Sequence, residues 1–73
     1  MTTETKFLIS VLIEKLTIQV MNDYNLSEAE ALDLIYNSQL YEKILDLETG
    51  LYYQSAGYNY ELLKSEIEYG KIK

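Results

Sequence analysis

The stretch TKFLISVLIEKLTIQVMNDY, residues 5–24, decides the fold of this 73-residue chain. Its polar residues recur at helical intervals of three and four, and most other side chains up to Val20 are apolar. These polar positions are Lys6, Ser10, Glu14 and Thr17. The many β-branched residues would also suit a strand, but the length of the run and the spacing of its polar residues favour a helix over residues 5–24.

A helix with so little polar surface is expected to be buried on more than one side. The chain is short enough that few other helices can cover it, and without Cys or His it lacks the disulfides or zinc that stabilise many small domains. We therefore expect a homo-oligomer, most simply a homodimer, that associates through this helix. The expected self-association residues are Ile9, Ile13 and Leu16.

Three serines predict where the later helices begin, because a serine at the N-cap accepts a hydrogen bond from a free backbone amide. Ser27 stands three residues before Glu30, the spacing of a capping box. Ser38 and Ser55 take the same place before the next two helical patterns. The expected helices cover residues 28–37, 39–47 and 56–69. Their expected inward residues are Leu32, Ile35 and Tyr36, then Leu40, Ile44 and Leu47, then Tyr60, Leu63 and Ile67.

The connections complete an all-α prediction. Asn25 is expected to end the first helix in the left-handed conformation, and Gly70 to end the last helix and leave residues 71–73 frayed. Residues 48–50 form a turn, and residues 51–54 are either extended or a helical turn. The expected fold is a single domain, residues 1–73, built as a compact bundle of about four helices with a short Tyr-rich connector before the last.

The composition removes most of the side chains used in catalysis and metal binding. Cys, His, Trp and Pro are absent, and all six basic residues are Lys. The carboxylates fall mainly on predicted outward faces and first helical turns, and no phosphate loop, nucleophile elbow or calcium loop is present. We therefore expect no enzyme activity, no catalytic residues, no cofactor and no metal site.

The net charge of −6 indicates which partners the chain favours. An acidic surface without Arg repels nucleic acid and anionic membranes, so a basic protein is the electrostatically favoured partner. The apolar run 7–13 is too short to span a bilayer and lacks the features of a secretion signal. The sequence therefore predicts a cytoplasmic protein.

The eight tyrosines are the best candidates for binding residues. Tyrosine gives a large contact area at low entropic cost and is enriched in binding hot spots. The predicted partner-binding residues are Tyr52, Tyr53 and Tyr58, which lie around the start of the last helix. The alternative is that these rings fill the boundary of a small core.

The helices expected at 28–37 and 39–47 also suggest a helix-turn-helix. Its second helix would present Gln39, Glu42, Lys43 and Asp46 to DNA, which is a poor set for reading bases. A degenerate helix-turn-helix regulator is therefore an alternative to a protein-binding module, and a purely structural homo-oligomer subunit is a third possibility.

Two strings in residues 34–62 resemble a pattern found in small, poorly characterised, acidic helical proteins of bacteria. The first is Leu34-Ile35-Tyr36-Asn37-Ser38-x-x-Tyr41, and the second is Gly50-Leu51-Tyr52-x-x-Ser55-x-x-Tyr58-x-x-Glu61-Leu62. Members of that group tend to be encoded beside toxins similar to ADP-ribosyltransferases. The resemblance covers about half the chain and implies an antitoxin-like or accessory partner of a toxin. Some relatives carry a His near Tyr52 or Tyr53 that this chain lacks, so no role of that His transfers.

Overall fold

Side-chain caps begin each of the four α-helices found in the part of the chain that the structure describes. In this computed structural model, which describes residues 1–70, the helices are α1 (Thr3–Tyr24), α2 (Glu28–Tyr36), α3 (Gln39–Leu45) and α4 (Ala56–Tyr69). Thr2 caps α1, and Ser27, Ser38 and Ser55 cap α2, α3 and α4 as predicted. The capping box of Ser27 and Glu30 is also confirmed.

Two short 3₁₀ helices, η1 (Leu47–Thr49) and η2 (Leu51–Tyr53), connect α3 to α4. Residues 1–70 contain no strand, so the all-α prediction is confirmed. The choice left open for residues 51–54 is settled as a helical turn followed by an extended residue, Gln54. Asn25 and Gly70 end α1 and α4 in the left-handed conformation as predicted. The predicted fraying falls on residues 71–73, which lie outside the described part.

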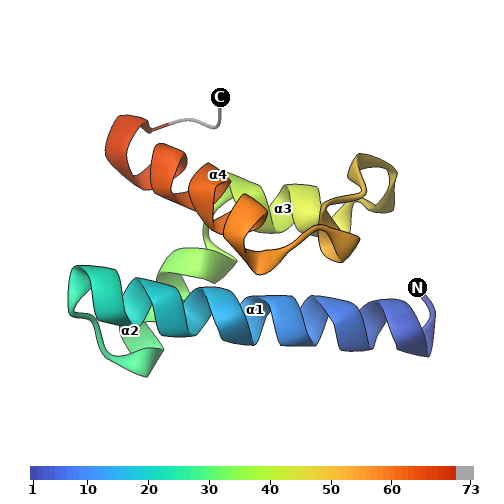
Figure 1. The fold of residues 1–73 in the computed structure, drawn as a ribbon, viewed down its shortest axis with the longest axis horizontal. Helices are drawn as coiled ribbons and strands as arrows, with labels where there is room; N and C mark the ends of the chain where they lie inside the picture. Colours follow the sequence, from blue (N-terminus) through green and yellow to red (C-terminus); the bar gives the residue numbers. More distant parts are fainter. Residues whose placement is uncertain (71–73) are drawn as a thin grey trace.

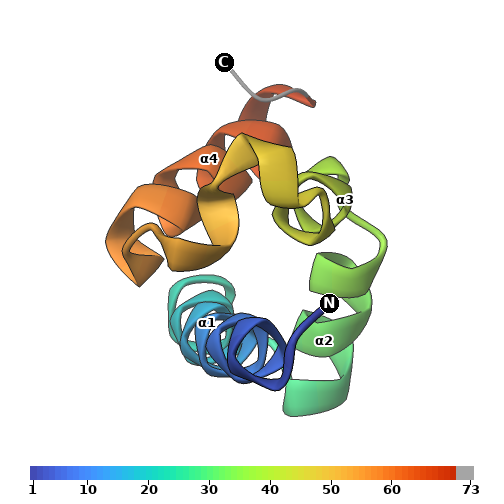
Figure 2. The ribbon, with the colours of Figure 1, turned by 90° about the vertical axis from the view of Figure 1, so that its right-hand side faces the viewer.

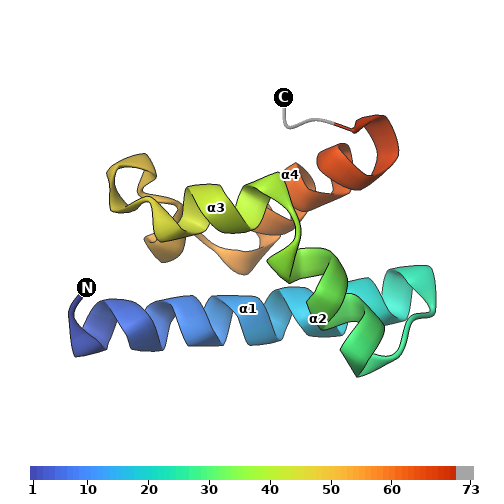
Figure 3. The ribbon, with the colours of Figure 1, turned by 180° about the vertical axis from the view of Figure 1, so that it is seen from behind.

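The helices form two layers. Figure 1 shows the long α1 along one side of the molecule, with α3, α4 and the connector on the other. In the view along α1, α1 and α2 lie side by side below α4 and α3 (Figure 2). From behind, α2 crosses in front of the C-terminal half of α1 (Figure 3). α1 contacts α2, α4 and η2, and α3 contacts α2, α4 and both 3₁₀ helices of the connector.

The core lies between the two layers. Its fully buried apolar side chains come from all four α-helices: Leu16, Val20, Ala31, Ile35, Leu40, Ile44 and Leu63. The predicted burial of Ile35, Leu40, Ile44, Tyr60 and Leu63 is confirmed, and Leu32 and Ile67 are partly buried against this core. Area removed from water supplies the main driving force for such packing.

Two residues predicted to be buried are exposed. Leu47 is exposed because α3 ends at Leu45 and not at residue 47: the Asp46 side chain accepts a hydrogen bond from the amide of Glu48 and starts η1. Tyr36 is exposed because it is the last residue of α2, where the chain turns toward Ser38. The predicted inward positions were therefore wrong at the ends of the helices.

One residue of the predicted polar stripe is buried. Thr17 lies in the interior because its hydroxyl donates a hydrogen bond of 2.7 Å to the carbonyl oxygen of Ile13, one turn earlier. A threonine hydroxyl that is satisfied by its own helix can be buried at little cost. The polar side of α1 is therefore narrower than the sequence spacing indicated.

Candidate functional site

The structure places the three predicted partner-binding tyrosines in two different surroundings. Tyr52 and Tyr53 belong to η2 and stack edge-to-face, with ring centroids 5.0 Å apart. Tyr53 is 64% exposed and Tyr52 is half-buried. Tyr58, in the first turn of α4, is 54% exposed but does not share the surface formed by the other two. The structure therefore brings Tyr52 and Tyr53 together and places Tyr58 apart from them.

Hydrogen bonds hold the segment that displays this pair. The Thr49 hydroxyl donates to the carbonyl oxygen of Lys43 at 2.6 Å and accepts from the amide of Leu51 at 3.2 Å. On the other side, Asn59, which is fully buried, donates from Nδ2 to the carbonyl oxygens of Leu51 (3.0 Å) and Ser55 (3.1 Å). The backbone of η2 is thus tied to α3 and α4, and Tyr53 is presented by a fixed turn.

Gly50 makes the sharp bend that precedes η2. Its φ of +70° lies in the left-handed region, which favours glycine. A Cβ at this position would lie 2.8 Å from the hydroxyl oxygen of Tyr53. The Tyr53 ring therefore folds back over the Gly50 backbone, and a larger residue there would displace it.

Tyr52 and Tyr53 face α1 across a shallow cleft, which we call the Tyr53 cleft. Its other wall comes from α1, and its end from the start of α4. It is lined by Leu8, Val11, Leu12, Lys15, Tyr52, Tyr53, Gln54, Ser55 and Ala56. Leu8 is 42% exposed, so both walls carry accessible apolar surface. The arrangement suits an apolar side chain of a partner, and Lys15 is the charged residue among those that line the cleft.

Sequence reasoning missed the α1 side of this cleft. Leu8 and Val11 lie in the apolar run of the first helix, but the sequence does not indicate which of its apolar residues face the Tyr-rich connector some 40 residues later. The one available signal was the surplus of apolar residues in that helix. That surplus was assigned to self-association, and part of it lines the Tyr53 cleft instead.

The predicted self-association residues are packed inside the chain. Ile9 and Ile13 are 8% and 6% exposed, and Leu16 is completely buried in the core. Side chains packed in this way have almost no surface left for a second copy, so a contact through α1 would have to use other residues. The exposed apolar residues of α1 are Phe7, Leu8 and Ile18. Self-association itself stays a prediction.

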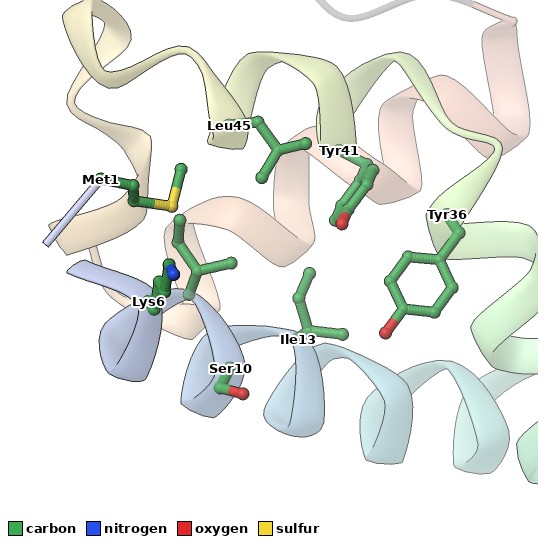
Figure 4. A pocket seen from close by; sticks show the side chains of 8 residues that line it. Met1, Lys6, Ser10, Ile13, Tyr36, Tyr41 and Leu45 are labelled. Carbon is green, nitrogen blue, oxygen red and sulfur yellow. The ribbon is translucent and has the colours of Figure 1, made fainter. Parts of the chain in front are cut away.

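A second cleft lies on the other side of α1 (Figure 4). Lys6, Ser10 and Ile13 of α1 face Tyr36, Tyr41 and Leu45, with Met1 at one end and Ile9 in the lining. The rings of Tyr36 and Tyr41 make an edge-to-face pair with centroids 5.0 Å apart. This pair accounts for the exposed Tyr36, whose ring packs on its neighbour at the surface and not in the core.

The N-terminus of α3, the proposed recognition helix of the alternative function, is occupied by a carboxylate. Glu66 of α4 accepts hydrogen bonds from the amides of Gln39 (2.7 Å) and Leu40 (3.0 Å). In helix-turn-helix proteins the N-terminal residues of this helix contact the bases. A negative charge at this position repels DNA phosphates and uses amide groups that could otherwise bind them.

Two tyrosines join the C-terminal part of α1 to α4. The Tyr60 hydroxyl donates to the Asp23 carboxylate, and burial together with this hydrogen bond raises the pKa of Tyr60 far above its ordinary value. The Tyr24 hydroxyl donates to Glu68 at 3.5 Å, and burial with the nearby Glu68 charge raises the pKa of Tyr24. Both hydroxyls therefore keep their protons at neutral pH, so these contacts serve as helix-to-helix hydrogen bonds.

Metal clusters and membrane-crossing helices were both sought among the described residues. Among residues 1–70, the acidic side chains form no group of three or more that could hold a metal ion. Over the same range, none of the helices combines the length and the apolar character that a bilayer-crossing segment needs. We found no match to the chain among protein-family models, curated proteins or solved structures.

Proposed function

We propose that this chain is a non-enzymatic protein–protein interaction module that acts in the cytoplasm and binds its partner at the Tyr53 cleft. The observation that carries the proposal is a tyrosine pair, exposed Tyr53 beside half-buried Tyr52, held by a hydrogen-bonded turn opposite the exposed Leu8 of α1. Rigid aromatic side chains beside an apolar pocket are typical of binding hot spots, because little conformational entropy is lost when they are covered.

Charge acts on this contact at two distances. The net charge of −6 attracts a basic partner during diffusion and raises the association rate. At short range, the charged side chain that lines the cleft is Lys15, so the contact there is mainly apolar. We therefore propose a basic protein partner that places an apolar side chain, and no lysine or arginine, between Leu8 and Tyr53.

The antitoxin-like part of the proposal rests on the resemblance in residues 34–62. Tyr52, one of its motif residues, lines the cleft, which supports a shared binding surface. The mechanism would be occlusion: the module covers a basic site of a toxin and blocks access to it. The regulator alternative is less well supported, since Glu66 occupies the N-terminus of α3.

The test compares two exposed tyrosines, one in the cleft and one outside it. Binding of the protein encoded by the neighbouring gene would be measured by pull-down and calorimetry. Tyr53→Ala should weaken binding by about 2 kcal/mol or more, roughly 30-fold. Tyr58→Ala, a matched loss of exposed ring outside the cleft, should change it by less than about 0.5 kcal/mol. Circular dichroism should show an unchanged helix content in both.

A second arm separates the proposal from the regulator. That alternative predicts that the chain binds upstream DNA in a gel shift. Lys43→Ala should then abolish this DNA binding, and Tyr53→Ala should leave it unchanged. Equal binding of the neighbouring protein by the Tyr53→Ala and Tyr58→Ala variants would contradict the cleft as the site. Absence of binding in both assays would favour a structural subunit.

A further inference from the structure

The outer side of α1 carries an apolar stripe formed by Phe7, Val11 and Ile18. Phe7 and Ile18 are 65% and 52% exposed, and Val11 is half-buried. The residues are four and seven positions apart, and seven residues make nearly two helical turns, so they lie close to one line along the helix. Figure 2 shows α1 with α2 beside it and α4 above it, which leaves the rest of its circumference uncovered, and the core residue Leu16 is fully buried on the covered part.

Opposite charges lie on the two sides of this stripe. With about 100° of rotation per residue, Glu14 and Lys15 lie about 50° to either side of the line through Val11 and Ile18. Both side chains are exposed. The outer side of α1 is therefore an apolar line with one acidic and one basic flank at the same height.

We infer that a second copy of this chain covers the stripe, with the two α1 helices parallel. A two-fold axis along the helices brings the left flank of one copy against the right flank of the other. Glu14 of each copy then faces Lys15 of the other, and Val11 and Ile18 meet their own counterparts. An antiparallel pair instead brings each flank against the same flank, so that Glu14 shares a side with Glu14.

The charges therefore determine whether the two α1 helices are parallel or antiparallel, and the apolar stripe supplies the buried area of the interface. Exposed ion pairs add little free energy, but flanking charges fix the register and direction of paired helices. In a parallel pair Phe7, an exposed ring on the same stripe, also meets its own counterpart in the second copy. This dimer surface lies on the side of α1 opposite Ile9 and Ile13, two of the residues that the sequence predicted for self-association.

The dimer surface and the proposed partner site share two residues but can be tested separately. Val11 and Lys15 belong to the stripe and its flank and also line the Tyr53 cleft, whereas Ile18 does not line it. Ile18→Glu should therefore convert a dimer to a monomer in sedimentation equilibrium, because it places an unpaired charge in the interface. Leu47→Glu, a matched change at a residue 41% exposed on η1, should leave the dimer intact. Circular dichroism should report the same helix content for both.

Charge reversal tests the orientation. Glu14→Lys or Lys15→Glu alone should raise the dimer dissociation constant about tenfold, and the double reversal should restore it. In an antiparallel dimer the single reversals would change little, since each flank would still face a like charge. Single reversals without effect would overturn the parallel arrangement.

Disulfide trapping gives an independent readout, because the chain has no other Cys. Oxidised Ile18→Cys protein should form a covalent dimer, as position 18 meets its counterpart. A mixture of Phe7→Cys and Ile18→Cys chains should give only the two like-with-like products. A preferred product joining position 7 to position 18 would show an antiparallel pair. A wild-type chain that remains monomeric at every concentration reached would overturn the inference altogether.

Discussion

Glu66 should be the acidic residue of α4 on which the position of α3 depends most. Its carboxylate accepts hydrogen bonds from the amides of Gln39 and Leu40, at 2.7 and 3.0 Å, and so links helices that are more than 20 residues apart in sequence. Without it, two of the amides at the N-terminus of α3 lose their protein acceptors. Ser38 caps a different amide, that of Tyr41, and cannot replace it.

The expected loss of stability in Glu66→Ala follows from the two hydrogen bonds and from how exposed they are. A helix N-cap is worth about 0.5–2 kcal/mol, and an acidic group near the positive end of a helix about 0.3–1 kcal/mol. Because Glu66 is only half-buried, we expect Glu66→Ala to lower the free energy of unfolding by about 2 kcal/mol in total. For a domain of this size, that corresponds to a urea midpoint lower by about 2 M and a melting temperature lower by roughly 8–16 °C.

Two further variants isolate the cause. Glu66→Gln keeps one acceptor oxygen and the shape of the side chain, and should lose about 1 kcal/mol. Glu61→Ala removes the same charge from an exposed position of α4 and should change the stability by less than about 0.5 kcal/mol. Urea unfolding followed by circular dichroism measures all three.

Amide hydrogen exchange locates the effect. In Glu66→Ala, the amides of Gln39 and Leu40 should exchange faster than in the Glu61→Ala chain, relative to the global unfolding rate of each. If Glu66→Ala were no less stable than Glu61→Ala, or if these two amides were unchanged, the carboxylate would not be holding α3 and the reasoning would fail.

Three other outcomes can be measured with the same protein. Gly50→Ala should cost about 1–2 kcal/mol, because alanine is strained at a φ of +70° and its Cβ would meet Tyr53, whereas Gly57→Ala in α4 should gain up to about 1 kcal/mol. The pKa of Tyr60 in the folded chain is raised above its unfolded value of about 10. Its contribution to stability is therefore complete below about pH 10 and falls as the pH rises further. Above about pH 10, the urea midpoint of Tyr60→Phe should therefore fall less steeply with pH than that of the wild-type chain. Calorimetry with Zn²⁺, Ca²⁺ or Mg²⁺ should give the metal-free melting temperature, since the acidic residues in 1–70 form no cluster of three.

The helices were predictable because their signals are local. A serine three residues before its amide partner marks a helix start wherever the chain folds, so the caps at Ser27, Ser38 and Ser55 could be assigned from sequence. The end of α3 was harder to predict, because the Asp46 side chain caps η1 and so ends α3 earlier than the apolar pattern indicates. That competition moved Leu47 from the expected core to the surface.

The candidate site was predictable only in part, because it joins segments far apart in sequence. Tyr52 and Tyr53 stood out by residue type, but their partners Leu8 and Val11 did not. A helix with apolar residues around most of its circumference does not indicate which side meets its own chain. Here the side containing Ile9 took that role, and the side containing Ile18 was left exposed.

The α2–α3 pair shows why function has to be argued from the site and not from the motif. Both helices were expected from sequence, and both are present, so the motif alone keeps DNA binding open. The feature that argues against it is Glu66, a residue of another helix whose carboxylate accepts hydrogen bonds from the amides at the start of α3. The same contact would make α3 a fixed support for the connector, since the Thr49 hydroxyl binds the carbonyl of Lys43 in α3 and the amide of Leu51 in η2. A helix anchored by a carboxylate at its start and bound to the Tyr-bearing turn near its end is better suited to positioning Tyr53 for a protein partner than to entering a groove of DNA.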